Sequence, residues 1–273
     1  MFFHCGNFQF DLSRPLVMGI VNVTPDSFSD GGKHLQRDAA LAHAQQLIAE
    51  GADILDIGGE STRPGARPVG IQEEMDRVLP IIEELRDAAV PISIDTFKPE
   101  VMLAAIAAGA QMVNDINALQ DAAAMNAVAA SHAAVCLMHK QGNPQTMQEQ
   151  PVYQNVVAEV RAFLSERITA AEAAGIQGDR IVIDPGFGFG KTLAHNLALL
   201  QGLSELASLG VPVLAGLSRK SMLGALTGQD VTQRLPASVA AALIAVQRGA
   251  NIVRVHDVRA TVDALKILRA VNS

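Results

Sequence analysis

The sequence predicts an α/β protein folded as a single (β/α)8 TIM barrel over residues 1–273. Eight short, apolar, β-branched runs recur at intervals of about 33 residues, which is the length of one βα unit. Each run is followed by polar or glycine-containing residues and then by an Ala- and Leu-rich stretch of helical character. The runs are continuously apolar rather than alternating, as is typical of strands buried on both faces of a parallel sheet. An open, doubly wound sheet is the alternative.

The expected strands and helices alternate along the chain. We expect strands at 16–21, 54–57, 91–94, 111–113, 134–138, 181–183, 212–217 and 252–255. Helices are expected at 38–50 and 99–108, each followed by a glycine that suits a C-cap. A third helix at 72–87 gathers its apolar residues on one face, and Pro80 inside it should kink or split it.

The composition and charge of the chain exclude several classes of partner and location. The formal net charge of −7 argues against nucleic acid or an anionic membrane surface as the main partner. No apolar run approaches the roughly 18 residues of a membrane span, and the first ten residues do not resemble a signal peptide. Cys5 and Cys136 lie far apart and form no CxxC motif, so neither a disulfide framework nor a zinc motif is expected. A cytoplasmic location fits best.

Polar residues gather at the predicted strand ends. In a barrel these ends converge on one mouth, where active sites lie. The residues there are Asn22, the 58–65 segment, Asp95, Asn114 with Asp115, Met138 with His139, Asp184, the 218–220 turn, and Arg254 with His256.

The cations of this group predict a site for a phosphate or diphosphate. The candidates are Arg63, Lys220, Arg254 and a protonated His256, with the neutral donors Thr62 and Ser218. Any one of these arginines alone would more often be a solvated surface residue. Their position at several strand ends favours anion binding.

The acceptors Asp95, Asn114 and Asp184 suit a flat heterocycle that presents paired N–H donors. Asp184 could instead be a turn or cap residue before Pro185. Asp56 lies just inside a strand end, and we interpret it as a hydrogen-bonding residue inside the barrel.

Several common motifs are excluded. The 184–192 segment fits neither a Walker loop nor a dinucleotide-binding loop, and its glycines predict a tight turn that lets backbone approach a ligand. The 216–220 segment lacks the last glycine of a nucleophile elbow. The histidines form no HxH or HExxH pair, which disfavours a metallohydrolase, although His139 could reach the mouth.

Five segments closely resemble the dihydropteroate synthase family of pterin-binding enzymes. They are GIVNVTPDSFSDGG (19–32), DIGGESTRPG (56–65), DPGFGFGK (184–191), SRK (218–220) and RVHDV (254–258). The resemblance implies a single pterin-binding barrel that condenses 4-aminobenzoate with (7,8-dihydropterin-6-yl)methyl diphosphate. The expected products are 7,8-dihydropteroate and pyrophosphate, in folate biosynthesis, by Mg²⁺-assisted, SN1-like loss of pyrophosphate.

The resemblance also implies the roles of individual residues. The residues expected to act in catalysis are Arg63, Asp95, Lys220, Arg254 and His256. Those expected to bind the pterin diphosphate are Thr62, Asp95, Asn114, Met138, Asp184, Phe189, Lys220, Arg254 and His256. The resemblance implies two substrate loops, the first at 24–32 and the second at 61–70. Those expected around 4-aminobenzoate and in the two substrate loops are Phe28, Asp30, Thr62, Pro64, Phe189, Lys220 and Ser221. Asn22 is the expected Mg²⁺ ligand.

The family resemblance further implies a homodimer and sensitivity to sulfonamide inhibitors, which resemble 4-aminobenzoate. Two other functions stay open at this point. One is a catalytically silent pterin-binding paralogue, and the other is the pterin-binding methyltransferase domain of corrinoid-dependent enzymes. Neither of these functions requires all five of the segments given above.

Overall fold

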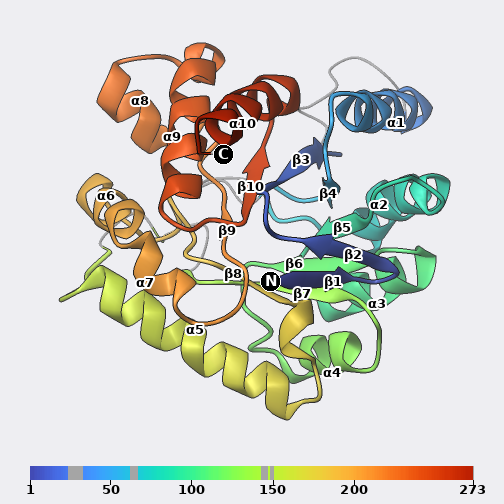
Figure 1. The fold of residues 1–273 in the computed structure, drawn as a ribbon. Coiled ribbons are helices and arrows are strands. Elements are labelled where there is room, and N and C mark those ends of the chain that lie inside the picture. The colour runs from blue at the N-terminus through green and yellow to red at the C-terminus, as the bar shows by residue number, and fades with distance from the viewer. Residues whose placement is uncertain (24–32, 62–66, 143–146, 148–150, 273) are drawn as a thin grey trace.

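The computed structural model describes residues 1–23, 33–61, 67–142, 147 and 151–272. Within these ranges helices surround a barrel of parallel strands (Figure 1). The barrel strands are β3 (Leu16–Asn22), β4 (Ile54–Gly58), β5 (Ile92–Asp95), β6 (Met112–Asp115), β7 (Ala134–Met138), β8 (Ile181–Asp184), β9 (Leu214–Ala215) and β10 (Ile252–Val255). The helices are α1 (Lys33–Ala49), α2 (Ile71–Leu85), α3 (Pro99–Ala108), α4 (Ala122–Ala129), α5 (Val156–Ala173), α6 (Leu193–Gln201), α7 (Leu203–Ala207), α8 (Ser221–Thr227), α9 (Leu235–Gln247) and α10 (Val258–Asn272).

The edges of the sheet meet, and this closes the barrel. The strands pair in the order β8-β7-β6-β5-β4-β3-β10-β9. A parallel bridge between Ile183 and Val213 then joins β8 to the segment before β9, and the Ile183 amide donates to the Pro212 carbonyl at 2.9 Å. The predicted single-domain (β/α)8 TIM barrel is therefore confirmed, and the open doubly wound sheet is not the fold.

The strand sequences are continuously apolar because each strand contributes side chains to two separate apolar cores. Alternate residues of a strand face opposite sides of the sheet. One set, including Val17 and Leu55, packs beneath the surrounding helices. The other set, including Met18, Ile54 and Met112, forms a second cluster inside the barrel. Both faces of each strand are buried, so hydrophobic burial stabilises the sheet from both sides.

An amino-terminal hairpin, which the sequence analysis did not predict, covers one end of the barrel. Strands β1 (Phe2–Cys5) and β2 (Phe8–Asp11) pair antiparallel across a turn at Gly6, whose φ is +57°. Phe3 and Cys5 are fully buried in the cluster inside the barrel. Figure 1 shows the hairpin lying across the strands in dark blue.

Some predicted boundaries were wrong. Strand β6 extends to Asp115, so Asn114 lies within the strand rather than after it. Strand β9 is only two residues long. Pro212 has no amide proton for a ladder, and the Val213 amide donates to the Asn251 side chain at 3.0 Å instead of to a strand.

Helix α2 runs without interruption through Pro80, so of the two predicted effects, a kink or a split, the split does not occur. Its buried side chains, Val78, Ile81, Ile82 and Leu85, hold it against the sheet despite the lost hydrogen bond. Helix α3 has the predicted bounds, and Gly109 ends it with φ +121°. Of the helices that the structure describes, none combines the length and the apolar character that crossing a bilayer requires.

We expect Phe3→Ala to lower the free energy of unfolding by about 3 kcal/mol or more, because it opens a cavity where the hairpin meets the inner core. Phe2, which is 56% exposed, provides the matched control, and Phe2→Ala should change stability by less than about 0.5 kcal/mol. Urea unfolding followed by circular dichroism measures both. Equal effects of the two substitutions would contradict the covering role of the hairpin.

Candidate active site

The side chains inside the barrel change from apolar to polar toward the carboxyl ends of the strands. Below lie residues such as Ile54, Met112 and Ile252. Above them on the same strands lie Asp56, Asn114 and Arg254, the first two of which are buried. The polar layer therefore occupies the mouth at which barrel enzymes act.

Arg254 is the centre of this layer. Its Nε donates to Oδ2 of Asp56 at 2.5 Å, and one terminal nitrogen donates to Oδ2 of Asp95 at 2.7 Å. Asp56 Oδ2 also accepts a hydrogen bond from Asn114 Nδ2 at 3.1 Å. The prediction that Asp56 hydrogen-bonds inside the barrel is confirmed, whereas its ion pair with Arg254 was not predicted. Two carboxyl groups, those of Asp56 and Asp95, therefore share one guanidinium.

Burial shifts the acid–base properties of this layer. Burial raises the pKa of Asp95 to about 7, although the Arg254 guanidinium opposes the shift. Burial also raises the pKa of Asp184, against the opposing effect of Lys220. Burial lowers the pKa of Lys220 to about 8, although Asp184 favours its charged form. Groups that titrate close to neutral pH therefore lie together in the mouth, as is common in active sites.

A glycine turn after β8 forms one wall of the mouth. Asp184 Oδ1 accepts the Gly186 amide at 2.7 Å, so the turn role considered for Asp184 is present in the structure. Gly188 has φ +79°, and a Cβ there would lie 3.3 Å from the Lys220 side chain. Lys220 Nζ donates to the Phe187 carbonyl and lies 4.7 Å from the centre of the Phe189 ring. The predicted tight turn is confirmed, and it brings Lys220 and Phe189 together.

Lys191 supports the turn from behind, and the sequence analysis did not predict this. Its Nζ lies 2.9 Å from His139 Nδ1 and donates to the carbonyls of Gly186 and Phe189, each at 3.0 Å. Burial lowers the pKa of Lys191 to about 7 and that of His139 to about 3. His139 packs edge-on against Phe163 and is 7% exposed, so it faces Lys191 and the helices. The sequence signal that could have indicated this role is Lys191 itself, a single lysine that directly follows the glycine-rich 186–190 segment.

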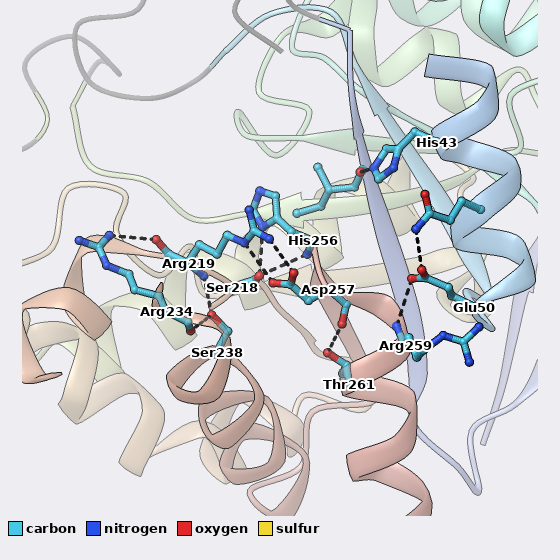
Figure 2. Close-up of polar contacts among 12 residues, drawn as sticks. His43, Glu50, Ser218, Arg219, Arg234, Ser238, His256, Asp257, Arg259 and Thr261 are labelled. Atoms are coloured by element: carbon cyan, nitrogen blue, oxygen red, sulfur yellow. Dashed lines mark hydrogen bonds and ion pairs between the residues drawn. The ribbon is translucent and has the colours of Figure 1, made fainter. Parts of the chain in front are cut away.

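Ser218 and His256 form a further part of the rim, where the segments after β9 and β10 meet. Ser218 Oγ lies 3.0 Å from His256 Nδ1 and accepts the His256 amide at 3.2 Å (Figure 2). Ser221 is the first residue of α8 and is exposed. Lys220 directly precedes that helix.

Asn22 and Asp95 border a common space beside Gly58. Gly58 pairs with both residues in the sheet. A Cβ on Gly58 would lie 3.8 Å from Asp95 Oδ2 and 3.9 Å from Asn22 Oδ1. Hard oxygen donors thus face this space. Across the described part of the chain, no cluster of three or more His, Cys, Asp or Glu side chains is arranged to hold a metal ion. Met138 is 4% exposed and pairs with Asp184 between β7 and β8.

Five predicted site residues lie outside the described residues: Phe28, Asp30, Thr62, Arg63 and Pro64. The base of the second loop is described and holds an ion-pair cluster that the sequence analysis missed. Lys98 pairs with both Glu60 and Glu74, and Glu74 is fully buried. Glu60 Oε1 also accepts the Val69 amide at 3.2 Å, so the cluster connects the two sides of the loop.

Comparison with known proteins places this barrel in a class and then in a family. Residues 18–256 match the sequence profile of a family described as pterin binding enzymes. The chain is 50% identical over 261 residues to a dihydropteroate synthase of Escherichia coli K12, covering 95% of this chain and 93% of that protein. It therefore belongs to the dihydropteroate synthase family of transferases.

Solved structures agree with this assignment. A Xanthomonas albilineans dihydropteroate synthase with 4-aminobenzoic acid has a TM-score of 0.94 at 57% identity, covering 100% of this chain and 98% of that one. The same organism's enzyme in complex with 7,8-dihydropteroate has a TM-score of 0.91 at 55% identity, with 100% and 99% covered. A Yersinia pestis enzyme in a sulfonamide drug complex has a TM-score of 0.94 at 49% identity, with 100% and 99% covered.

We expect Lys191→Met to destabilise the protein by about 2 to 3 kcal/mol, because it removes a buried charged donor to the carbonyls of Gly186 and Phe189, of which the Gly186 carbonyl keeps the Phe189 amide at 3.1 Å. The control is Lys266→Met, which removes a lysine that is 72% exposed and paired only at the surface of α10, and its cost should stay within about 0.5 kcal/mol. Chemical denaturation measures both variants. Unchanged stability of Lys191→Met would contradict the supporting role.

Proposed function

We propose that this protein is a dihydropteroate synthase in activity. It condenses (7,8-dihydropterin-6-yl)methyl diphosphate with 4-aminobenzoate and releases 7,8-dihydropteroate and pyrophosphate, a step of folate biosynthesis. The polar layer around Arg254 carries the proposal, because it combines acceptors for a heterocycle with cations for a diphosphate at one barrel mouth. The Xanthomonas albilineans complex with 7,8-dihydropteroate, at 55% identity, supports the choice of product.

The pterin ring is assigned to the deep acceptors. Asp95, Asn114 and Asp184 accept its N–H groups, since a carboxylate can accept two parallel hydrogen bonds from an amidine-like edge. Lys220 donates to the ring, and Arg254 stacks over its face. Met138 and Phe189 supply apolar contact nearby. The low exposure of Asn114 and Asp184, 5% and 6%, supports strong discrimination against rings that lack these donors.

The diphosphate is assigned to the cationic rim of Arg254 and His256, together with Thr62 and Arg63. Asn22 fits a Mg²⁺ ion, because its amide oxygen is a hard donor beside Asp95 and Gly58. A Mg²⁺ ion that keeps most of its waters and bridges to phosphate needs few protein ligands. When bound, the ion would neutralise charge on the leaving diphosphate.

The proposed chemistry is dissociative. The bond between the methylene carbon and the diphosphate oxygen breaks first, and its electron pair leaves with pyrophosphate, because the pterin delocalises the resulting cation. Arg254 and His256 stabilise the leaving charge, while Asp95, or Asp30 in the first loop, offsets the positive charge on the pterin. The aromatic amine then attacks the methylene carbon and loses a proton to solvent. This route requires no covalent enzyme intermediate.

The 4-aminobenzoate pocket is assigned to Phe189, Lys220 and Ser221, with Phe28, Asp30, Thr62 and Pro64 from the two substrate loops. The close contact between Lys220 and the Phe189 ring supports this pocket, because it joins a cation to an aromatic face. Sulfonamides are expected to compete for it. The Yersinia pestis complex with a sulfonamide drug, at 49% identity, supports that expectation.

We also propose a cytoplasmic homodimer. Exposed apolar side chains occur along the segment from α8 to α9: Leu226, Val231, Leu235 and Ile244. Burying such side chains against a second copy favours association. The cytoplasmic location rests on two free, buried cysteines, Cys5 and Cys136.

Pyrophosphate release by the purified protein with pterin diphosphate and Mg²⁺ tests the proposed function. Release should rise when 4-aminobenzoate is added, and Arg254→Ala should reduce kcat by about 100-fold or more, since it removes the main charge stabilisation. Tight pterin binding without release would favour the silent paralogue. Transfer of a methyl group in place of release would favour the methyltransferase domain.

The pH profile of kcat/KM for the pterin diphosphate should be bell-shaped. Protonation of Asp95 below about pH 7 removes an acceptor, so activity falls on the acid side. Deprotonation of Lys220 above about pH 8 removes a cation, so activity falls on the alkaline side. Steady-state assays from pH 5.5 to 9.5 measure both limbs.

The Asp95→Asn variant tests whether Asp95 is the group whose protonation lowers activity on the acid side of this profile. It should be slower than the unaltered protein, and its acid limb should flatten because position 95 no longer titrates. An acid limb with the same midpoint in Asp95→Asn would show that another group is responsible.

A further inference from the structure

The turn between β9 and α8 contains a residue in a conformation that its side chain disfavours. Arg219 has φ +58°, in the left-handed region that favours glycine. Its two neighbours, Ser218 and Lys220, both make contacts in the mouth of the barrel. The positions of these neighbours depend on the backbone of Arg219, so whatever holds that backbone also holds them.

Four hydrogen bonds hold Arg219 in place (Figure 2). Its Nε and one terminal nitrogen donate to the two carboxylate oxygens of Asp257 at 3.0 and 2.6 Å. Its amide donates to Ser238 Oγ at 2.9 Å, and its carbonyl accepts from Arg234 at 3.1 Å. The two-point pair with Asp257 fixes the orientation of the guanidinium as well as its distance.

Asp257 connects this turn to the segment after β10. It directly follows His256, whose amide and Nδ1 both lie within 3.2 Å of Ser218 Oγ. Two parallel connections therefore join the segments after β9 and β10, one from Ser218 to His256 and one from Arg219 to Asp257 (Figure 2). The Asp257 carbonyl also accepts the Thr261 hydroxyl at 2.8 Å, which ties it to the first turn of α10.

We propose that Arg219 and Asp257 are positioning residues for the reaction proposed above, on which this inference rests. Their ion pair keeps residue 219 in its left-handed conformation and sets Lys220 and His256 relative to each other, without contact to substrate. Arg219 differs in this respect from the other cations of the rim. Its donors are directed to Asp257, whereas Lys220 is directed to the glycine turn.

The test compares Arg219→Gly with Arg219→Ala and includes a control pair. Arg219→Ala removes the ion pair and keeps the Cβ that disfavours φ +58°, so the strained turn loses its support. Arg219→Gly removes the ion pair and the strain together, so the turn can keep its conformation. The control is Arg14→Gly. Arg14 makes a similar two-point pair with Asp53 at the opposite end of the barrel, with side chains 46% and 13% exposed against 38% and 14% for Arg219 and Asp257.

Three measurements are needed: urea unfolding, steady-state kinetics with both substrates, and calorimetric affinity for inorganic pyrophosphate. We expect Arg219→Gly to fold, to lose about tenfold in kcat/KM and to lose affinity for pyrophosphate, and Arg219→Ala to lose more. Arg14→Gly should stay within about twofold in both functional measurements. Asp257→Asn should resemble Arg219→Gly, and the double variant should cost no more than either single variant, because the two residues act as one unit.

Three results would overturn the inference: Arg219→Gly with kinetics and pyrophosphate affinity unchanged, functional losses no larger than those of Arg14→Gly, or additive losses in the double variant. The unaltered protein separates this outcome from failure of the proposed function. If it releases no pyrophosphate from pterin diphosphate, the proposed function fails. The calorimetric comparison of Arg219→Gly with Arg14→Gly still decides whether the ion pair positions the rim.

Discussion

The ion pairs of the half-buried Arg254 guanidinium are the interactions on which the mouth of this barrel depends. A charge inside a barrel is stable only with partners, and Arg254 has Asp56 on β4 and Asp95 on β5. Asp56 in turn orients Asn114 on β6. One side chain therefore fixes acceptors from three strands. The second carboxylate oxygen of Asp56 has no hydrogen-bond partner among the residues that the structure describes, so the layer still has capacity for a donor.

Two lysines hold the glycine turn from opposite sides. Lys191 donates from the helix side to carbonyls of the turn, and Lys220 donates from the mouth to the Phe187 carbonyl. Burial lowers the pKa of both. Backbone carbonyls are neutral acceptors, so neither lysine is locked in a salt bridge with the turn. The wall of the site is thus held by two lysine donors whose protonation can change with the charge of a bound ligand.

The sequence predicted the barrel because its signal is local and repeated eight times. The strand ends were predicted to within a few residues, and Asp95, Asn114, Asp184 and Arg254 were placed at the mouth on that basis. Contacts between distant segments were not predictable. Asp56 and Arg254 are separated by 198 positions, and no local pattern shows that they pair. Arg219 shows the same limit, because adjacent cations in the sequence do not reveal that one of them turns away to Asp257.

The hairpin at the amino-terminal end also affects the order of events in the proposed reaction. Because Phe3 and Cys5 fill that end of the barrel, a molecule held in the polar layer can enter and leave only through the mouth. In the proposed reaction the pterin, assigned to the deep acceptors, would therefore bind before 4-aminobenzoate, and the two would leave together as one product. A ligand bound near the rim would slow escape of the deeper one. A barrel that is closed at one end thus favours ordered addition of the two substrates in the proposed reaction.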